Sequence, residues 1–182
     1  MSRSGSKGAG DKWPGDNRQG NSRPRGGLSC RIRPLGPFDI DAASVIHGEC
    51  FGMEAWDRKA IQEVLAMPTA IGRLAVDPVA GDLRPLGMAL ISIVAGEAEL
   101  LTIGVRQSAR RRGVGAALVE DFLALAASRG ATEAFLEVAE DNEAAFLLYC
   151  AHGFTAQGWR HDYYRRPGNR RIAARVLRRV IA

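Results

Sequence analysis

The spacing of apolar positions changes several times between residues 29 and 181, and each change predicts a new element. Alternating or unbroken apolar runs predict strands, whereas apolar residues three or four positions apart predict amphipathic helices. Strands are predicted over 29–34, 69–76, 86–94, 134–138, 154–164 and 171–181, with a further one that enters at Gly96-Glu97 and ends at Val105. Four helices are predicted among these strands. The strands and helices follow one another in the order β-α-α-β-β-β-α-β-α-β-β. The chain is therefore predicted to be α/β.

The first two predicted helices are joined by the segment 51–56. Asp39 or Asp41 can cap the first helix, and Asp57 can open the second. The expected buried faces are Ile40, Ala43, Val45, Ile46 and Cys50 in the first helix, and Ala60, Ile61, Val64 and Leu65 in the second. The joining segment carries Glu54 between aromatic residues, which is typical of a substrate entrance, although each aromatic taken alone favours the core.

The two later helices have clear boundaries. Val114 and Leu118 recur at helical spacing in the third helix, which closes at Arg129-Gly130, with glycine in the usual position after a helix. Asp141 or Asn142 can cap the fourth helix, which runs to Gly153.

The net charge of +5 is unevenly distributed. Residues 1–27 carry six Lys/Arg and two Asp, and residues 158–182 carry eight Arg and one Asp. Residues 28–157 carry 11 Lys/Arg and 17 Asp/Glu, so an acidic body lies between two basic ends. An acidic body attracts cationic substrates such as amines or basic peptides. The ends are interpreted as solvated charge, and contact with RNA is the weaker alternative.

Residues 1–27 are rich in Gly, Ser, Arg and Asn and have almost nothing to bury, which predicts a disordered basic tail. Residues 28–182 are predicted to form one domain, and the 46% hydrophobic content of the chain suits a globular protein. No apolar run approaches the roughly 18 residues of a membrane span, and no signal-peptide pattern opens the chain. We therefore expect a cytoplasmic protein without membrane contact.

The cysteines and histidines form no metal or nucleophile pattern. The three cysteines are Cys30, Cys50 and Cys150. They are widely spaced, and we interpret them as buried residues in a reducing compartment. The histidines are interpreted as structural or surface residues, namely His47, His152 and His161. We expect no bound metal.

A glycine-rich basic turn, Arg110-Arg111-Arg112-Gly113-Val114-Gly115-Ala116, separates a buried strand from the third helix. The first N–H groups of a helix have no intrahelical partner, and the positive end of the helix dipole lies behind them. Such a turn can bind an anion. Glycines at 113 and 115 let the backbone come close to a phosphate, because no Cβ stands in the way.

Known anion-binding loops can be compared with this turn. A Walker A loop is excluded because Gly115 is followed by Ala116 and not by Lys. A dinucleotide-binding turn would need a third glycine at Leu118 and would follow its strand directly, whereas residues 106–112 intervene. The pattern Arg/Gln-x-x-Gly-x-Gly/Ala fits Arg110 to Gly115, and a solvated basic loop that merely starts a helix is the alternative.

This pattern resembles the pyrophosphate loop of the GNAT superfamily of acetyl-CoA-dependent N-acetyltransferases. The element order also resembles the GNAT fold, which implies a central mixed, splayed sheet flanked by helices. Further pieces resemble the RimI-type branch, which acetylates the N-terminal alanine of a small-subunit ribosomal protein, namely Leu136-Glu137-Val138, Asn142, Leu148-Tyr149, Gly153-Phe154 and Tyr163-Tyr164. One departure is Arg170-Arg171 before the last strand, where the branch has an acidic residue, and it bears on the acceptor more than on the acetyl donor.

The resemblance implies a site for acetyl-CoA and no metal. Glu137 would serve as general base and Tyr149 as general acid, while Asn142 would touch the pantetheine arm. Backbone groups would bind the acetyl and pantetheine part at Ile103, Gly104 and Val105, on a strand whose neighbour splays away. Backbone amides would bind the pyrophosphate at Arg110, Arg111, Arg112, Gly113, Val114, Gly115 and Ala116.

The residue types suit this chemistry. Attack on a thioester needs a neutral amine, and an α-amine has a pKa near 8 against about 10.4 for lysine, so an α-amine is the easier substrate for one carboxylate. Glu137 shares a strand face with Phe135, and partial burial there would make it a better base than a surface glutamate. From spacing alone, Glu137 could also face water, Tyr149 could be core and Asn142 only a cap. The pair Tyr163-Tyr164 could line a peptide slot or fill the sheet.

We therefore expect an enzyme that transfers acetyl from acetyl-CoA to the N-terminal amine, most simply of alanine, of a ribosomal or other protein. One alternative is a GNAT enzyme that acts on a small amine such as a polyamine or an aminoglycoside. Another is a GNAT-fold protein that binds acetyl-CoA or RNA without turnover, against which the presence of both Glu137 and Tyr149 argues.

Overall fold

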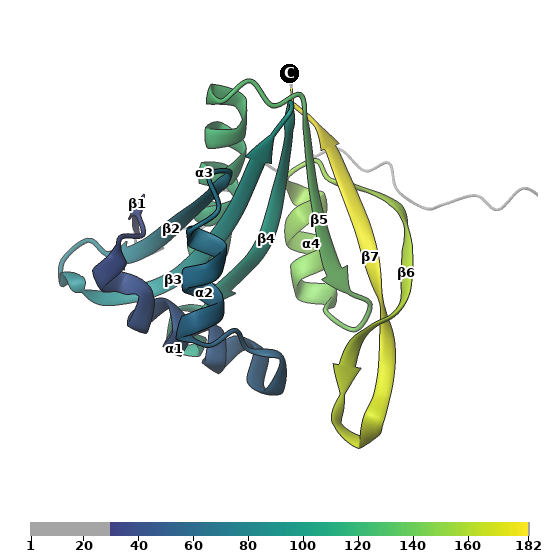
Figure 1. The fold of residues 1–182 in the computed structure, drawn as a ribbon, viewed down its shortest axis with the longest axis horizontal. Helices are drawn as coiled ribbons and strands as arrows, with labels where there is room; N and C mark the ends of the chain where they lie inside the picture. Colours follow the sequence, from purple (N-terminus) through teal and green to yellow (C-terminus); the bar gives the residue numbers. More distant parts are fainter. Residues whose placement is uncertain (1–29, 182) are drawn as a thin grey trace, which may run out of the picture.

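The computed structural model describes residues 30–181, apart from the side chains of residues 81–83 and 169 (Figure 1). The predicted tail, residues 1–27, lies outside the described residues. The strands are β1 (Arg31–Pro34), β2 (Ala70–Asp77), β3 (Gly81–Val94), β4 (Glu97–Val105), β5 (Glu133–Ala139), β6 (Thr155–Arg166) and β7 (Arg170–Val180). The helices are α1 (Ile40–Phe51), α2 (Arg58–Leu65), α3 (Val114–Ser128) and α4 (Glu143–Ala151), with 3-10 turns η1 (Pro37–Asp39), η2 (Gly52–Glu54), η3 (Gln107–Ala109) and η4 (Pro167–Asn169). The predicted element order is confirmed.

The strands form a 7-stranded sheet in the order β1-β2-β3-β4-β5-β7-β6. Its pairings are antiparallel except for β4 with β5, which is parallel and extends only from Glu97–Glu133 to Leu100–Leu136. Beyond these pairs the two strands diverge toward their carboxyl ends, with α4 visible behind the opening (Figure 1). The mixed, splayed sheet implied by the family resemblance is thus confirmed.

Apolar side chains cover both faces of the sheet. One core cluster packs Leu118 and Phe122 of α3 against β3, β4 and β5, and the other packs Ile46 of α1 and Ile61 of α2 against β2 and β3. Side chains alternate between the two faces along β5, and Ala134, Leu136 and Val138 point into the first cluster. Glu137 therefore projects to the opposite face, on the side of α1 and α2.

Local capping agrees with the sequence pattern. The Asp57 carboxylate accepts a hydrogen bond from the Ala60 N–H at 2.8 Å at the start of α2. Asn142 caps α4 in the same way, through a 3.2 Å bond from the Ala145 N–H. Strand β3 begins earlier than predicted, because its pairing with β2 continues past Pro85 to Gly81.

Two burial predictions are wrong. Val45 was expected on the buried face of α1, yet 53% of it is exposed. Consecutive helical residues lie about 100° apart, so with Ile46 fully buried Val45 turns toward solvent. The cysteines carry free thiols, but Cys30 and Cys50 are only half-buried and Cys150 is exposed.

Candidate active site

The glycine-rich turn between β4 and α3 presents a row of unpaired donors. Arg111 and Gly113 have positive φ angles of 60° and 81°, and Gly113 occupies the cap position of α3 without a side-chain cap. Within the described part of the chain, no hydrogen bond is made by the backbone N–H groups of residues 111–116. The turn therefore meets the first requirement of a diphosphate site.

Two arginine side chains brace this turn. The Arg110 Nε donates to the Val105 carbonyl at 3.2 Å, and an Arg112 terminal nitrogen donates to the Ser108 carbonyl at 3.2 Å. Both guanidinium groups thus fold back onto carbonyls of their own segment. The unpaired donors of the turn are therefore backbone N–H groups, and the positive charges of Arg110 and Arg112 lie next to them.

The backbone of β4 alternates in direction beyond its pairing with β5. The Arg106 N–H donates to the carbonyl of Leu86 on β3. Because hydrogen-bonding directions alternate along an antiparallel strand, the backbone N–H and C=O of Gly104, two positions earlier, also face β3. Those of Ile103 and Val105 face the opening, and the Val105 carbonyl already accepts from Cys50 Sγ and Arg110. A Cβ at Gly104 would lie 3.2 Å from Cys50 Sγ, so this glycine allows the close approach of α1.

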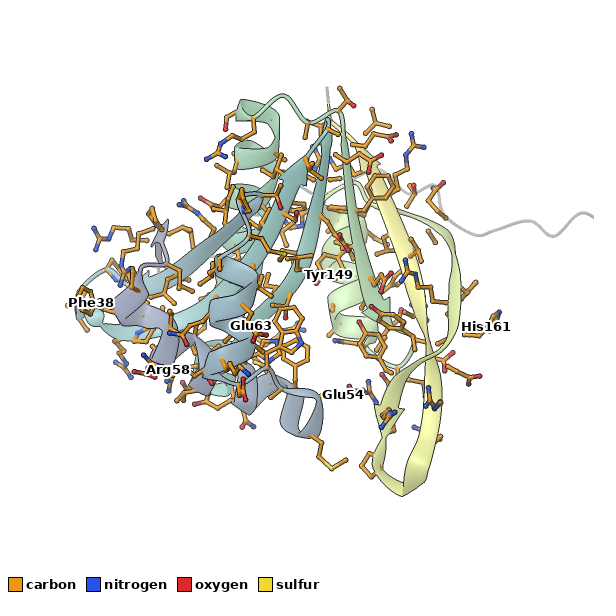
Figure 2. All side chains as sticks on the ribbon, in the orientation of Figure 1. Phe38, Glu54, Arg58, Glu63, Tyr149 and His161 are labelled. Carbon is orange, nitrogen blue, oxygen red and sulfur yellow. The ribbon has the colours of Figure 1, made fainter. Side chains whose placement is uncertain are left out.

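A cavity of about 250 Å³ lies where β4 and β5 diverge. It brings together four of the residues that the sequence indicated, namely Ile103, Glu137, Asn142 and Tyr149. Gly104, Val105 and residues 110–116 are not part of its lining. The other lining residues are Cys50, Phe51, Glu54, Leu100, Leu101, Thr102, Val138, Ala139, Ala145, Tyr164 and Arg166. Figure 2 labels Tyr149 near the divergence of the two strands and Glu54 on the η2 side.

Glu137 is the first residue of β5 beyond the last pair with β4, and only 15% of its side chain is exposed. Its Oε1 lies 2.8 Å from the Nε of Arg160 on β6. The Tyr163 hydroxyl hydrogen-bonds the same carboxylate, which raises the pKa of that phenol. Glu137 is therefore partly buried and not a water-facing carboxylate, which were the two alternatives that spacing left open, and its ionic partner was not predicted.

Tyr149 is buried in α4 and packs edge-on against Phe154, with ring centroids 6.0 Å apart. Burial raises the pKa of its hydroxyl, so the group stays protonated at neutral pH. The structure gives this hydroxyl no hydrogen-bond partner among residues 30–181, although it lines the cavity. Tyr149 is therefore a core residue whose hydroxyl is available to hydrogen-bond a ligand in the cavity.

His47 is buried in α1 against the cavity wall. It accepts a hydrogen bond from the Trp56 N–H and contacts the Thr102 hydroxyl, and it stacks on Phe51. Burial lowers the pKa of its imidazole to about 4. His161 is exposed and His152 bonds the Leu148 carbonyl, in agreement with the structural or surface interpretation of the histidines.

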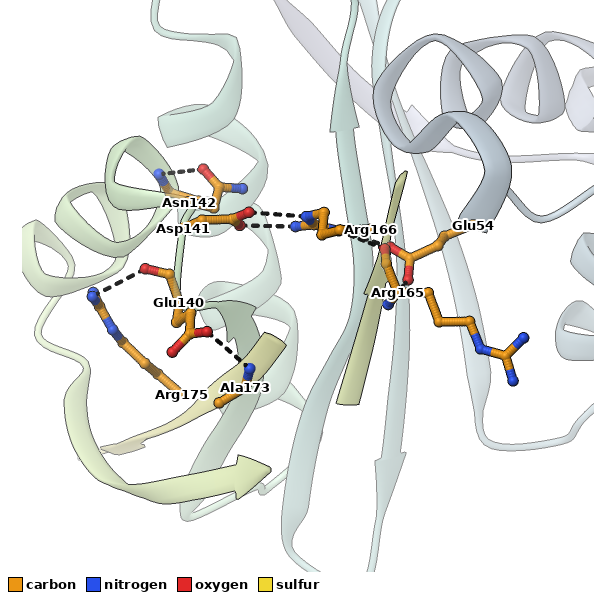
Figure 3. A network of polar contacts seen from close by, with 9 residues as sticks. Glu54, Glu140, Asp141, Asn142, Arg165, Arg166, Ala173 and Arg175 are labelled. Carbon is orange, nitrogen blue, oxygen red and sulfur yellow. Dashed lines mark hydrogen bonds and ion pairs between the residues drawn. The ribbon is translucent and has the colours of Figure 1, made fainter. Parts of the chain in front are cut away.

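A chain of ion pairs connects three segments at the cavity (Figure 3). Arg166, at the end of β6, donates to both oxygens of Asp141 at 2.9 and 2.8 Å and to Glu54 at 3.1 Å. Glu54 also accepts from the Arg165 backbone N–H at 2.5 Å. We call Glu54, Asp141 and Arg166 the mouth bridge. It joins η2 and the β5–α4 turn to the β6–β7 hairpin.

Sequence reasoning identified Glu54 as a residue of the entrance but missed its partners. Arg166 is two positions after Tyr164, so the arginine pair that follows the two tyrosines was the available signal. For the described residues, no cluster of potential metal ligands is found, and no helix is long and apolar enough to cross a membrane.

The sequence signature of the acetyltransferase (GNAT) family matches residues 42–154. A [ribosomal protein bS18]-alanine N-acetyltransferase of Salmonella typhimurium is 36% identical over 83 residues, which cover 46% of this chain and 56% of that protein. The chain thus spans about half the length of the curated relatives it matches.

Solved structures share the fold. The ribosomal-protein-S18-alanine N-acetyltransferase from Escherichia coli has a TM-score of 0.76 at 25% identity, covering 85% of this chain and 95% of that one. Arabidopsis thaliana NAA60 in complex with acetyl-CoA has a TM-score of 0.74 at 20% identity, covering 84% and 99%.

Proposed function

Because the chain belongs to the acetyltransferase (GNAT) family, we propose that it transfers an acetyl group from acetyl-CoA to the N-terminal α-amine of a protein. The observation that carries the proposal is the cavity at the divergence of β4 and β5. It places the carboxylate of Glu137 and the unpartnered hydroxyl of Tyr149, which come from different elements, around one space.

Acetyl-CoA fits the residues beside this cavity. The unpaired N–H groups of residues 111–116 suit its diphosphate, and the polar backbone groups of Ile103 and the Val105 N–H suit its pantetheine arm. The Asn142 side-chain oxygen is occupied as the cap of α4, which leaves its amide NH₂ for the same arm. When bound, acetyl-CoA supplies the activated acetyl group.

Glu137 accepts the proton that the acceptor amine must lose before it attacks. Burial and the contact with Arg160 hold the carboxylate in place at the edge of the cavity. Tyr149 donates a hydrogen bond toward the departing sulfur and supplies its proton. Because burial raises the pKa of Tyr149, this proton moves only as negative charge develops on the sulfur.

A protein N-terminus is favoured as acceptor over a lysine side chain. Its pKa is about 2.5 units lower, which makes the neutral amine roughly 3.4 kcal/mol easier to form. The names of the relatives from Salmonella typhimurium and Escherichia coli support an N-terminal alanine of a ribosomal protein, and hence a cytoplasmic site of action. Small amines such as polyamines are the second candidate, because residues 28–157 carry 17 Asp/Glu against 11 Lys/Arg and an acidic body attracts cations.

The test supplies acetyl-CoA with an alanine-starting peptide, a lysine peptide with a blocked N-terminus, and a polyamine, and measures thiol release. Only the alanine-starting peptide should be acetylated efficiently. Glu137→Gln and Tyr149→Phe should each lower kcat by about 10²- to 10⁴-fold. Glu63→Gln, an exposed carboxylate on α2, is the control. Preferential turnover of the polyamine, or full activity of both site variants, would overturn the proposal.

A further inference from the structure

The partner of Glu137 comes from an edge strand two positions away in the sheet. β7 separates β5 from β6, and its residues Val176 and Ala174 pair with Glu137 and Arg160 respectively. The Arg160 side chain crosses this intervening strand to reach Oε1 of Glu137 at 2.8 Å. It is 60% exposed, whereas the Glu137 side chain is 15% exposed. The contact therefore places a largely exposed cation on a largely buried carboxylate.

A second carboxylate faces the same space. Glu99 on β4 pairs with Phe135 on β5, so it projects to the same face of the sheet as Glu137. Glu99, Glu137 and Arg160 line one further cavity of about 250 Å³, and Glu137 also lines the cavity that holds Tyr149. Burial raises the pKa of Glu99, the charge of Glu137 raises it further, and Arg160 lowers it.

We propose that Arg160 is a positioning residue for acetyl transfer, whose guanidinium balances the Glu99 and Glu137 carboxylates and so holds the Glu137 carboxylate ready to take a proton. This inference rests on the proposed function, in which Glu137 is the base. It assigns Arg160 an effect through Glu137 and no contact with the substrate.

The other groups around Glu137 do not supply a positive charge. The Tyr163 hydroxyl hydrogen-bonds it, and Tyr164 packs edge-on against Tyr163 with ring centroids 5.0 Å apart. Nearer the mouth, Arg166 is held by Glu54 and Asp141. Among residues 30–181, Arg160 is thus the cation recorded in contact with Glu137.

Loss of this cation has a definite consequence. Two carboxylates that face each other without a counter-charge share a proton over a range of pH, and the protonated member cannot act as a base. Removing Arg160 should therefore reduce kcat/KM on the acidic side of the pH profile. Removing Glu99 as well should relieve the repulsion and restore the profile.

The experiment measures kcat/KM against pH for the full chain with acetyl-CoA and the alanine-starting peptide. In Arg160→Gln the acidic limb should lie about one pH unit higher than in the wild type. In Arg160→Lys it should stay near the wild-type position, because the charge is retained. In Glu99→Gln/Arg160→Gln it should return toward the wild-type position. Glu99→Gln alone should move the limb to lower pH, which gives a second measurement independent of any change at Arg160.

The control is Arg171→Gln on the same hairpin, because the Arg171 guanidinium donates to the Asp162 carbonyl oxygen and not to a carboxylate. Its profile should match the wild type. An unshifted limb in Arg160→Gln, or a shifted limb that Glu99→Gln fails to correct, would overturn the inference. Full turnover in Glu137→Gln would instead remove the proposed base, so the two failures are distinguishable.

Discussion

The His47 Nε2 lies 3.0 Å from the Thr102 hydroxyl oxygen and joins α1 to the diverging part of β4. The Trp56 backbone N–H donates to Nδ1 at 2.9 Å, so Nδ1 carries no proton and Nε2 is the donor to Thr102. Phe51 and Trp56 both stack on the imidazole, with ring centroids 4.2 and 5.3 Å away. These contacts hold one wall of the cavity, and they require a neutral imidazole.

This requirement predicts a loss of stability in mild acid. Burial lowers the pKa of His47 from 6.5 to about 4, so between these values the unfolded chain binds more protons than the folded one. The free energy of unfolding therefore rises with pH in this window, and His47 should account for a loss of about 2 kcal/mol between pH 7 and pH 5.

Urea unfolding at the two pH values tests this prediction. His47→Gln should lack this part of the pH dependence, whereas His161→Gln, a change at an exposed histidine, should retain it. Identical pH dependence in the wild type and His47→Gln would show that the buried imidazole does not bear on stability.

The mouth bridge predicts an effect on acceptor binding. Arg166→Gln removes the bidentate contact with Asp141 and the side-chain contact with Glu54. The β5–α4 turn then loses its link to the β6–β7 hairpin, and η2 keeps only the bond from the Arg165 N–H. The KM for an acceptor peptide should rise about three- to tenfold, which corresponds to ~0.6–1.4 kcal/mol. The KM for acetyl-CoA should not change, since residues 110–116, which we propose bind its diphosphate, lie on another segment.

Steady-state kinetics with each substrate varied in turn provide the measurement. Arg171→Gln again serves as the matched arginine control. A parallel rise of both KM values would mean that Arg166 supports the fold in general and does not shape the acceptor mouth.

Two glycines with left-handed backbone provide a matched pair at the ends of α3. Gly113 precedes the helix with a φ of 81°, and Gly130 follows it with a φ of 75°. A Cβ would meet no atom within 4 Å at either position, so alanine brings the same backbone strain of about 1–2 kcal/mol to both.

Gly113→Ala should weaken acetyl-CoA binding about 5- to 30-fold, because the strain distorts the unpaired donors. Gly130→Ala should lower the melting temperature about as much as Gly113→Ala does, and it should leave the affinity for acetyl-CoA unchanged. Isothermal titration calorimetry and thermal unfolding of both variants give the comparison. Equal affinities in the two variants would contradict a binding role for the turn.

Features set by neighbouring residues could be predicted from the sequence. The Asp57 cap, the Asn142 cap and the turn at residues 110–116 depend on local backbone geometry, and the structure reproduces the caps and the helix start after Gly113. The face of Glu137 also followed from strand alternation, because β5 has regular pairs with β7 throughout.

Long-range partners could not be predicted in the same way. Arg160 and Glu137 are 23 positions apart, and the register of β6 against β7 shifts between Arg160 and Tyr164, so simple alternation does not give the faces of this strand. Arg166 and Glu54 are 112 positions apart and meet only through the folded sheet. The exposed Val45 shows a similar limit, since its position depends on how α1 turns against the sheet.

We propose that the backbone of residues 111–116 holds the diphosphate of acetyl-CoA. Amide chemical shifts measured by NMR during titration test this directly, with S-acetylpantetheine, which lacks the diphosphate, as the comparison ligand. Acetyl-CoA should shift the N–H signals of residues 111–116, and S-acetylpantetheine should not. Saturation with acetyl-CoA that leaves these signals in place would contradict it.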